Sequence, residues 1–130
     1  MDSTSDIDEV MKVFHSILSA AEKGDVEGYL DAITDDAVMM YSGMPAIIGK
    51  KAARSFITDF LRNNRFQFTD YTFQEKRVME DWALMRFTGV AVISPKNGGE
   101  PSILDRKYID IYRRENGRWR LSHHIYNLNE

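Results

Sequence analysis

The chain has 130 residues, of which 43% are hydrophobic and 12% aromatic, as is typical of one globular domain with a well-filled core. The formal net charge is -3, and the 17 basic and 20 acidic residues are interspersed, which argues against a nucleic-acid partner. The absence of cysteine excludes disulfides, thiolate metal sites and thiol nucleophiles.

The N-terminus is polar and acidic. Its first ten residues, MDSTSDIDEV, resemble neither a signal peptide nor a transit peptide. No apolar run approaches the length that crosses a bilayer. We therefore expect a single domain over residues 1–130 that is cytoplasmic and has no membrane partner.

Two helices are predicted at the start of the chain. The first begins with a capping-box-like pair, Ser5 and Asp8, and ends near Gly24, which can adopt the left-handed conformation of a helix stop. Asp25 can cap a second, shorter helix that runs to Ile33. Residues 34–36, Thr-Asp-Asp, are expected to break that helix.

A short strand and a third helix are predicted next. Residues 37–41, AVMMY, read as a buried strand, and the following Ser-Gly-Met-Pro ends it. After Gly49 the apolar residues return to helical spacing, with Phe56 and Phe60 on one face. Asn63 and Asn64 end this helix.

From Phe66 onward the apolar residues recur every second position, which predicts strands over residues 66–79 and 82–94. A flexible loop at 95–99 leads to a hairpin over residues 103–126. Helices followed by a meander of strands indicate an α+β domain with a mostly antiparallel sheet.

The hairpin carries large apolar groups on both faces. Tyr108, Asp110 and Tyr112 lie on one side of its first strand, whereas Ile109 and Ile111 lie on the other. Since neither face can be left in water, we expect helices to cover one face. Another subunit could cover the other face.

Two registers are open for this hairpin. A two-residue loop at Asn116-Gly117 places Asp110 opposite His123, and the shared parity of His123 with the apolar residues of its strand slightly favours this register. A three-residue loop with a bulge at the glycine places Asp110 opposite Ser122. A slip of one residue decides which histidine points inward.

Asp110, His123 and His124 are the candidate catalytic residues. Burial disfavours an ionised Asp110, leaving a neutral acid that donates a hydrogen bond, while a histidine suits a general base. The simpler alternative is a structural Asp110 bonded to an arginine or a tyrosine, with one histidine in the core and one on the surface. Adjacent strand histidines cannot both reach one ion, so we expect no metal and no cofactor.

The order of these motifs resembles the SnoaL-like domains of the nuclear transport factor 2-like superfamily, which also contains the ketosteroid isomerases. The resemblance covers nearly the whole chain and rests on Gly24-Asp25, Asp36-Ala37-Val38, Gly43-x-Pro45-x-x-x-Gly49-Lys50-x-Ala52 and the segment from Tyr108 to His124. It implies a cone of three N-terminal helices on a strongly curved sheet, with an apolar pocket between them and a homodimer through the outer sheet face.

The resemblance does not carry over the isomerase activity. On this alignment the isomerases' general-base aspartate falls at Tyr41 or Met40, and their oxyanion-hole tyrosine falls at Ile17. Only their second acid is matched, by Asp110. Because a tyrosine or methionine cannot supply the carboxylate base, we expect no ketosteroid isomerase activity.

The expected ligand is a small apolar or aromatic metabolite, because methionines and aromatic side chains form an adaptable apolar lining. Arg106 could bind a ligand carboxylate or form an exposed ion pair. Beside this binding function stand two alternatives, namely a cofactor-free acid/base enzyme using Asp110 and a histidine, and a non-catalytic dimerisation or adaptor module. The candidate ligand-binding residues are Tyr41, Met40, Phe56, Phe60, Trp82, Arg106, Tyr108 and Tyr126.

Overall fold

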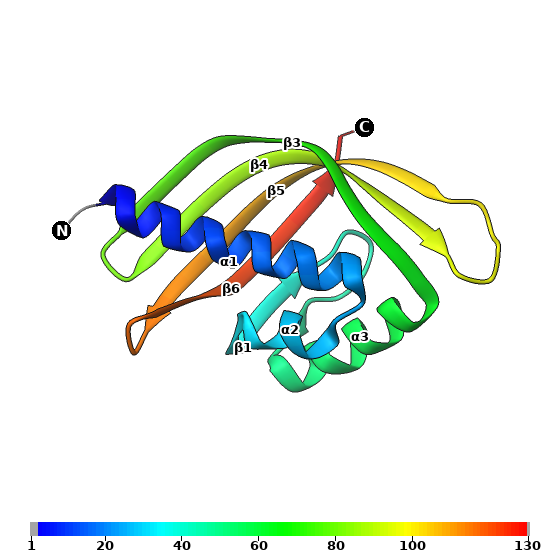
Figure 1. The fold of residues 1–130 in the computed structure, drawn as a ribbon, viewed down its shortest axis with the longest axis horizontal. Coiled ribbons are helices and arrows are strands. Elements are labelled where there is room, and N and C mark those ends of the chain that lie inside the picture. The colour runs from blue at the N-terminus through cyan, green and yellow to red at the C-terminus, as the bar shows by residue number, and fades with distance from the viewer. Residues whose placement is uncertain (1–2, 130) are drawn as a thin grey trace.

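The computed structural model describes residues 3–129, which form three helices and one six-stranded sheet (Figure 1). Helix α1 crosses the sheet, and α2 and α3 pack at one end of it. The elements in chain order are α1 (Ser3–Lys23), α2 (Val26–Asp31), β1 (Ile33–Met40), β2 (Ile47–Ile48), α3 (Lys50–Asn63), β3 (Asn64–Met79), β4 (Trp82–Pro95), β5 (Ser102–Glu115) and β6 (Arg118–Leu128).

The sheet has the strand order β2-β1-β6-β5-β4-β3, and only the β1–β6 pair within residues 3–129 is parallel. The strands β3 to β6 are long and curve together, so the sheet has a concave face toward the helices (Figure 1). The predicted α+β class, with three N-terminal helices on a curved, mostly antiparallel sheet, is confirmed. No helix in the described part of the chain is long and apolar enough to span a membrane.

The first two helices follow the predicted signals closely. Gly24 has φ of 74°, the left-handed conformation that ends α1, and the Asp25 side chain accepts a hydrogen bond of 3.0 Å from the Gly28 amide at the start of α2. The helix α1 begins at Ser3, two residues before the predicted start at Ser5. Its buried face includes Val10 and Phe14.

The predicted break at residues 34–36 is wrong, because these residues belong to β1. The helix α2 ends at Asp31, and Ile33 already pairs with Leu121 of β6. Ile33 and Thr34 are fully buried, and the Thr34 hydroxyl donates to the Asp36 carboxylate at 2.9 Å. Pairing with β6 therefore overrides the local turn preference of the Thr-Asp-Asp segment.

The hairpin register differs from both predicted alternatives. The turn is the two-residue Asn116-Gly117 loop, with positive φ at both positions, and Glu115 pairs with Arg118. Further along, however, the register shifts between Ile111 and Tyr112, with Ser122 as the extra residue on β6. Asp110 therefore pairs with His124, and not with His123 or Ser122.

The core lies between α1 and the concave face of β3 to β6. The Phe14 ring from α1 meets Phe73 and Phe87 edge-on, with ring centroids 5.0 and 5.4 Å apart. Each such aromatic side chain contributes about 1.5–3 kcal/mol through burial of its apolar surface. This packing fixes the distance between α1 and the sheet. A space remains beside α1, near α3.

Candidate functional site

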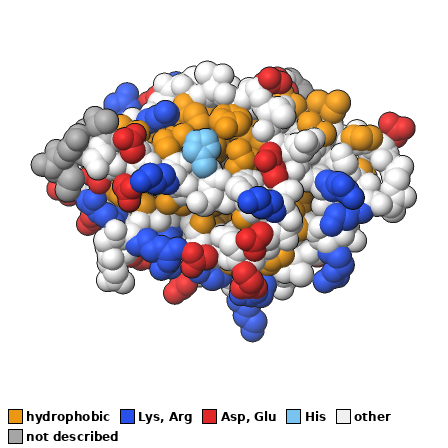
Figure 2. Space-filling view, viewed as in Figure 1, with side chains coloured by type: hydrophobic (Ala, Val, Ile, Leu, Met, Phe, Trp, Pro, Cys, Tyr) orange, Lys and Arg blue, Asp and Glu red, His pale blue; other side chains and the backbone are white. Residues whose placement is uncertain are grey.

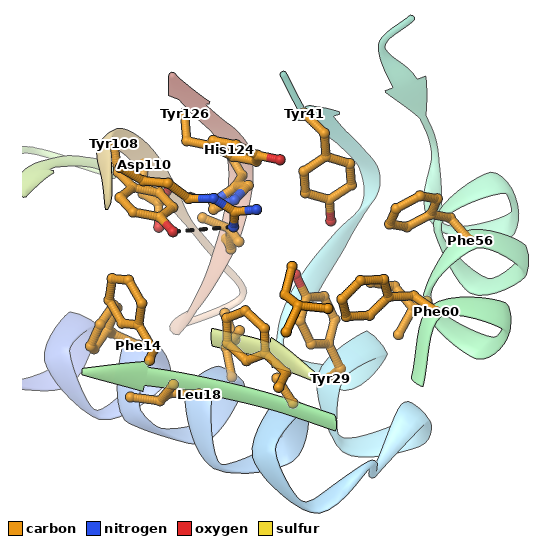
Figure 3. A pocket seen from close by; sticks show the side chains of 18 of the residues that line it. Phe14, Leu18, Tyr29, Tyr41, Phe56, Phe60, Tyr108, Asp110, His124 and Tyr126 are labelled. Carbon is orange, nitrogen blue, oxygen red and sulfur yellow. Dashed lines mark hydrogen bonds and ion pairs between the residues drawn. The ribbon is translucent and has the colours of Figure 1, made fainter. Parts of the chain in front are cut away.

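That space is a cavity of about 190 Å³ between the helices and the concave sheet face. It is larger than the apolar cavity of about 150 Å³ that holds a benzene molecule in an engineered protein. Its wall is formed by α1, α2, α3, β3, β4, β5, β6 and the loop after β1, and Figure 3 shows part of it. Room for one or two aromatic rings is therefore available.

The α3 side of the cavity is a row of aromatic rings. Tyr41 stacks on Phe56 with centroids 4.9 Å apart, and Phe56 stacks on Phe60 at 6.1 Å. Ser42 and Met44 also line the cavity and are exposed, so the loop after β1 forms part of its mouth. Flat apolar groups fit this side of the cavity better than charged groups.

Asp110 and His124 form a hydrogen-bonded pair on the opposite wall. They are partners across β5 and β6, and His124 Nδ1 lies 2.7 Å from Asp110 Oδ1. Asp110 is 3% exposed and the His124 side chain is 16% exposed, so the acid is almost fully shielded from solvent and the imidazole mostly so. A carboxylate accepts the Nδ1 proton, which leaves the Nε2 lone pair of His124 free to accept another. The structure gives Asp110 a histidine as its hydrogen-bond partner, and the neutral, hydrogen-bond-donating Asp110 expected from the sequence stays a prediction.

Four buried tyrosines add hydroxyl groups to the cavity. Burial raises the pKa of Tyr29 and of Tyr108 to about 12 in each case. Burial also raises the pKa of Tyr41 and Tyr112 well above the usual value of a phenol. All four are therefore neutral hydrogen-bond donors at neutral pH. The Tyr112 hydroxyl has no hydrogen-bond partner within residues 3–129.

Arg106 brings a buried positive charge to the same cavity. The residue is 8% exposed, and its guanidinium lies 3.9 Å from the centroid of the Tyr126 ring. One of its terminal nitrogens donates a long hydrogen bond of 3.4 Å to the Tyr108 hydroxyl, and Nε has no partner in the described chain. The exposed ion pair considered from the sequence does not form.

Most of the sequence-predicted residues lie together around the cavity. This set is Asp110, His124, Tyr41, Phe56, Phe60, Arg106, Tyr108 and Tyr126. That they bind or react with a ligand stays a prediction.

Three predicted residues do not line the cavity. Met40 alternates with the inward-facing Met39 and Tyr41, and is 44% exposed. Trp82 is 41% exposed, and its ring is 6.5 Å from that of His123 on the convex sheet face. Strand alternation thus places all three on the outer side, and for His123 the bulge at Ser122 decides the direction.

Several lining residues were missed from the sequence. Phe14 and Leu18 of α1, Tyr29 of α2 and Tyr112 of β5 all contribute to the cavity wall. Tyr112 shares strand parity with Asp110, so this signal was available. The helical residues carried no such signal, because a core position and a cavity position look alike in an apolar repeat.

Residues 3–129 contain no group of three or more histidine and acidic side chains arranged to hold a metal ion. The polar groups of the cavity are one cation, one carboxylate, one imidazole and several hydroxyls. They can bind and orient a small molecule and can move a proton.

Comparison with known proteins matches residues 6–122 to the model of the SnoaL-like domain. No curated protein sequence matches the chain. The family match covers most of the chain, including β5 with Asp110, and ends two residues before His124.

Solved structures with the same arrangement cover nearly the whole chain. A conserved protein from Planctomyces limnophilus has a TM-score of 0.86 and 23% identity, over 96% of this chain and 98% of that one. A ketosteroid isomerase-like protein from Erwinia carotovora atroseptica has a TM-score of 0.83 and 20% identity, over 95% and 96%. A protein of the nuclear transport factor 2-like family from Streptomyces avermitilis has a TM-score of 0.85 and 18% identity, over 99% of both chains. At these identities the likeness concerns the fold alone.

Proposed function

The chain belongs to the family of SnoaL-like domains, and from this premise we propose that it binds a small, flat, largely apolar metabolite in the cavity between its helices and its sheet. The observation that carries the proposal is the aromatic cavity itself. An ordinary core closes to near-crystalline density, and a void of about 190 Å³ forfeits packing energy unless something fills it.

The lining determines the shape of the expected ligand. Tyr41, Phe56 and Phe60 present their rings in a stacked series, and Tyr108 and Tyr126 present theirs from the sheet, with centroids 5.6 Å apart. A planar ring inserted between these walls can make offset-stacked and edge-on contacts on both of its sides. The hydroxyls at the cavity wall can fix its orientation.

The test of binding uses 2-naphthol, which is flat, neutral and able to accept and donate a hydrogen bond. We expect it to bind and to raise the melting temperature in proportion to its occupancy of the folded state. The variant Leu18→Trp fills the cavity from α1 and should abolish the shift. The matched control Ile103→Trp adds the same ring at a site that is 73% exposed and should leave the shift intact. Equal shifts in both variants, or none in the parent protein, would contradict the proposal.

A second candidate function, favoured by the 2.7 Å Asp110–His124 contact, is cofactor-free acid/base catalysis. His124 Nε2 would take a proton from a carbon next to a ligand carbonyl, and the paired Asp110 carboxylate would stabilise the resulting imidazolium. The electron pair left on the ligand would move to the carbonyl oxygen, where a tyrosine hydroxyl can donate a hydrogen bond. Returning the proton to another atom would complete an isomerisation.

This candidate is tested with 2-tetralone, whose activated carbon protons exchange with deuterium when a base removes them. In heavy water the protein should accelerate their loss from the proton spectrum. His124→Gln should abolish the acceleration while the ketone still binds, and His15→Gln, at an exposed position on α1, should leave it unchanged. Acceleration that survives His124→Gln would rule out the candidate and leave the binding function standing.

We also propose that the chain forms a homodimer through the convex face of the sheet. Apolar groups on that face are uncovered in the single chain, with Ile109 39% exposed and Trp82 41% exposed. A central apolar area with a polar rim is the usual composition of such an interface. Light scattering should give the mass of two chains for the parent protein and of one chain for Ile109→Glu. A monomeric parent protein would contradict the dimer and would also remove support for an adaptor function of this face.

A further inference from the structure

Arg106 indicates the chemical class of the ligand. We propose that the molecule bound in the cavity carries an acid group, a carboxylate or an equivalent oxyanion, which pairs with the Arg106 guanidinium. This inference rests on the proposed binding function and adds to it the charge and the orientation of the ligand.

The first reason is that Arg106 is buried and has no counter-ion among residues 3–129. It is 8% exposed, and no carboxylate of the described chain lies within 4.0 Å of its guanidinium. Its inward-facing neighbour on β5, Asp110, is already paired with His124. A buried charge is costly unless it is paired and hydrogen-bonded, so this site has unused capacity for an anion.

Three other arginines of the hairpin show what a satisfied arginine looks like in this protein, whereas Arg120 also has an Nε without a partner in residues 3–129 but does not line the cavity. Arg113 reaches the Asp36 carboxylate at 2.6 Å, and Arg114 reaches Asp6 at 2.9 Å. Arg118 pairs with Asp31. All three side chains are more exposed than Arg106, yet each of them pairs with an acidic side chain. Arg106, where the need is greatest, has only the long contact to the Tyr108 hydroxyl and the Tyr126 ring face.

The second reason is the way the guanidinium is held. Stacking on Tyr126 at 3.9 Å fixes the plane of the group without using its N–H donors. Nε has no partner in residues 3–129, and the bond from a terminal nitrogen to Tyr108 is long at 3.4 Å. A planar fork with free donors matches the two oxygens of a carboxylate.

The strand spacing gives the orientation of the ligand. Arg106 and Asp110 are four residues apart on β5, with Tyr108 between them on the same face, so their backbones are about 13 Å apart. The two side chains border one cavity and reach into it, which shortens the span between their polar ends. An acid group on Arg106 would leave the ring of the ligand against Tyr108 and its far end beside His124.

The test compares two matched probes, 2-naphthoate and its neutral amide 2-naphthamide, by titration calorimetry. The parent protein should bind the carboxylate at least about tenfold more tightly than the amide, because charge-assisted bidentate bonds are the stronger ones. Arg106→Gln should remove that preference and still bind the amide. Arg106→Lys, which keeps the charge without the fork, should retain part of the preference.

A stability measurement separates this role from a structural one. If Arg106 is kept for an anion, Arg106→Met replaces an unpaired buried charge with an apolar side chain and should leave the ligand-free denaturation midpoint equal or higher. A clear fall of the midpoint in both Arg106→Met and Arg106→Gln would assign Arg106 to structure and overturn the inference. Equal affinity of the parent protein for the two probes would also overturn it while the binding function stands. If neither probe binds, the proposed function fails together with the inference.

Discussion

Both faces of the β5–β6 hairpin carry paired charged or titratable side chains, but the pairs lie in different surroundings. On the concave face, Asp110 and His124 pair inside an aromatic cavity. On the convex face, Arg113 pairs with Asp36 and lies 5.5 Å from the Trp82 ring at the surface. The surface on the helix side of the molecule carries acidic and basic side chains interspersed around apolar ones (Figure 2).

The comparison shows that the face of the sheet on which a side chain lies, more than its residue type, decides whether it borders the cavity. His123 and His124 are adjacent and identical, yet only His124 borders the cavity. The extra residue Ser122 sets this direction, since it shifts the register of the strand that follows. Ser122 is 1% exposed, and its hydroxyl donates to the Ile111 carbonyl at 3.1 Å, which anchors the bulge.

Inserting one alanine after Ser122 should have the largest effect, because the bulge already takes up one extra residue and a second one exchanges the two faces beyond it. His124 and Tyr126 would turn outward and His123 inward, so the Asp110 pair and the Arg106 stack would both be lost. We expect a loss of more than about 4 kcal/mol in the free energy of unfolding, or no folded protein. Urea denaturation followed by circular dichroism measures it.

The control for this insertion is Ser122→Ala, which keeps the length of β6 and removes only the hydroxyl. It should cost about 1 kcal/mol, the net worth of a typical hydrogen bond. If the insertion were as mild as the alanine substitution, the register of β6 would not be what separates the two histidines.

Asp110→Ala tests the concave pair and should have the next largest effect. It leaves the Nδ1–H of the mostly buried His124 without an acceptor, and we expect a loss of about 3 kcal/mol in stability. Asp110→Asn keeps an amide oxygen as acceptor and should lose clearly less. Nitrogen NMR of the imidazole should show the proton on Nδ1 in the parent protein and a mixture of tautomers in Asp110→Ala. An unchanged tautomer would mean that Asp110 does not orient His124.

The buried tyrosines make the concave face sensitive to alkali. The pKa of Tyr29 is about 12 in the folded chain against 10.0 for a free phenol, because burial penalises the phenolate. Between these values the folded state binds more protons than the unfolded state, so stability falls as pH rises. The contribution is complete below pH 10.0, and up to about 3 kcal/mol is lost by pH 12.

Tyr29→Phe supplies the comparison for this alkaline transition. It removes the titrating group while keeping the ring, so the fall in stability over this pH range should become shallower. Denaturation at a series of pH values, with phenolate absorbance followed in parallel, measures both changes. An identical slope in the variant would show that Tyr29 ionises as readily in the folded chain as in the unfolded chain.

The fold was easier to predict from the sequence than the residues of the site, and particular residues show the reason. Helix caps such as Asp25 and the Asn116-Gly117 turn are local signals, and both were found where the structure has them. The bulge at Ser122 depends on pairing across two strands, and the extended conformation of residues 33–36 depends on β6. Such long-range pairing decides which histidine lines the cavity, so the site was only partly predictable.

The smallest expected effect belongs to the convex pair of Asp36 and Arg113. The Arg113 guanidinium donates to the Asp36 carboxylate and, with the Thr34 hydroxyl, holds its pKa below the usual value of 3.8. This contribution is therefore present above that pH and is lost as pH falls further. Because the Asp36 side chain is 68% exposed, water screens the pair, and Asp36→Asn should cost only about 0.5 kcal/mol.

Salt distinguishes this outer pair from the inner one. Raising the salt concentration should remove most of the difference between Asp36→Asn and the parent protein, because mobile ions reach an exposed pair. The cost of Asp110→Ala should hardly change with salt, since Asp110 is 3% exposed and its partner is a hydrogen-bonded imidazole. If both costs fell equally with salt, the concave face would be as accessible to ions as the convex face, and a shielded cavity would be untenable.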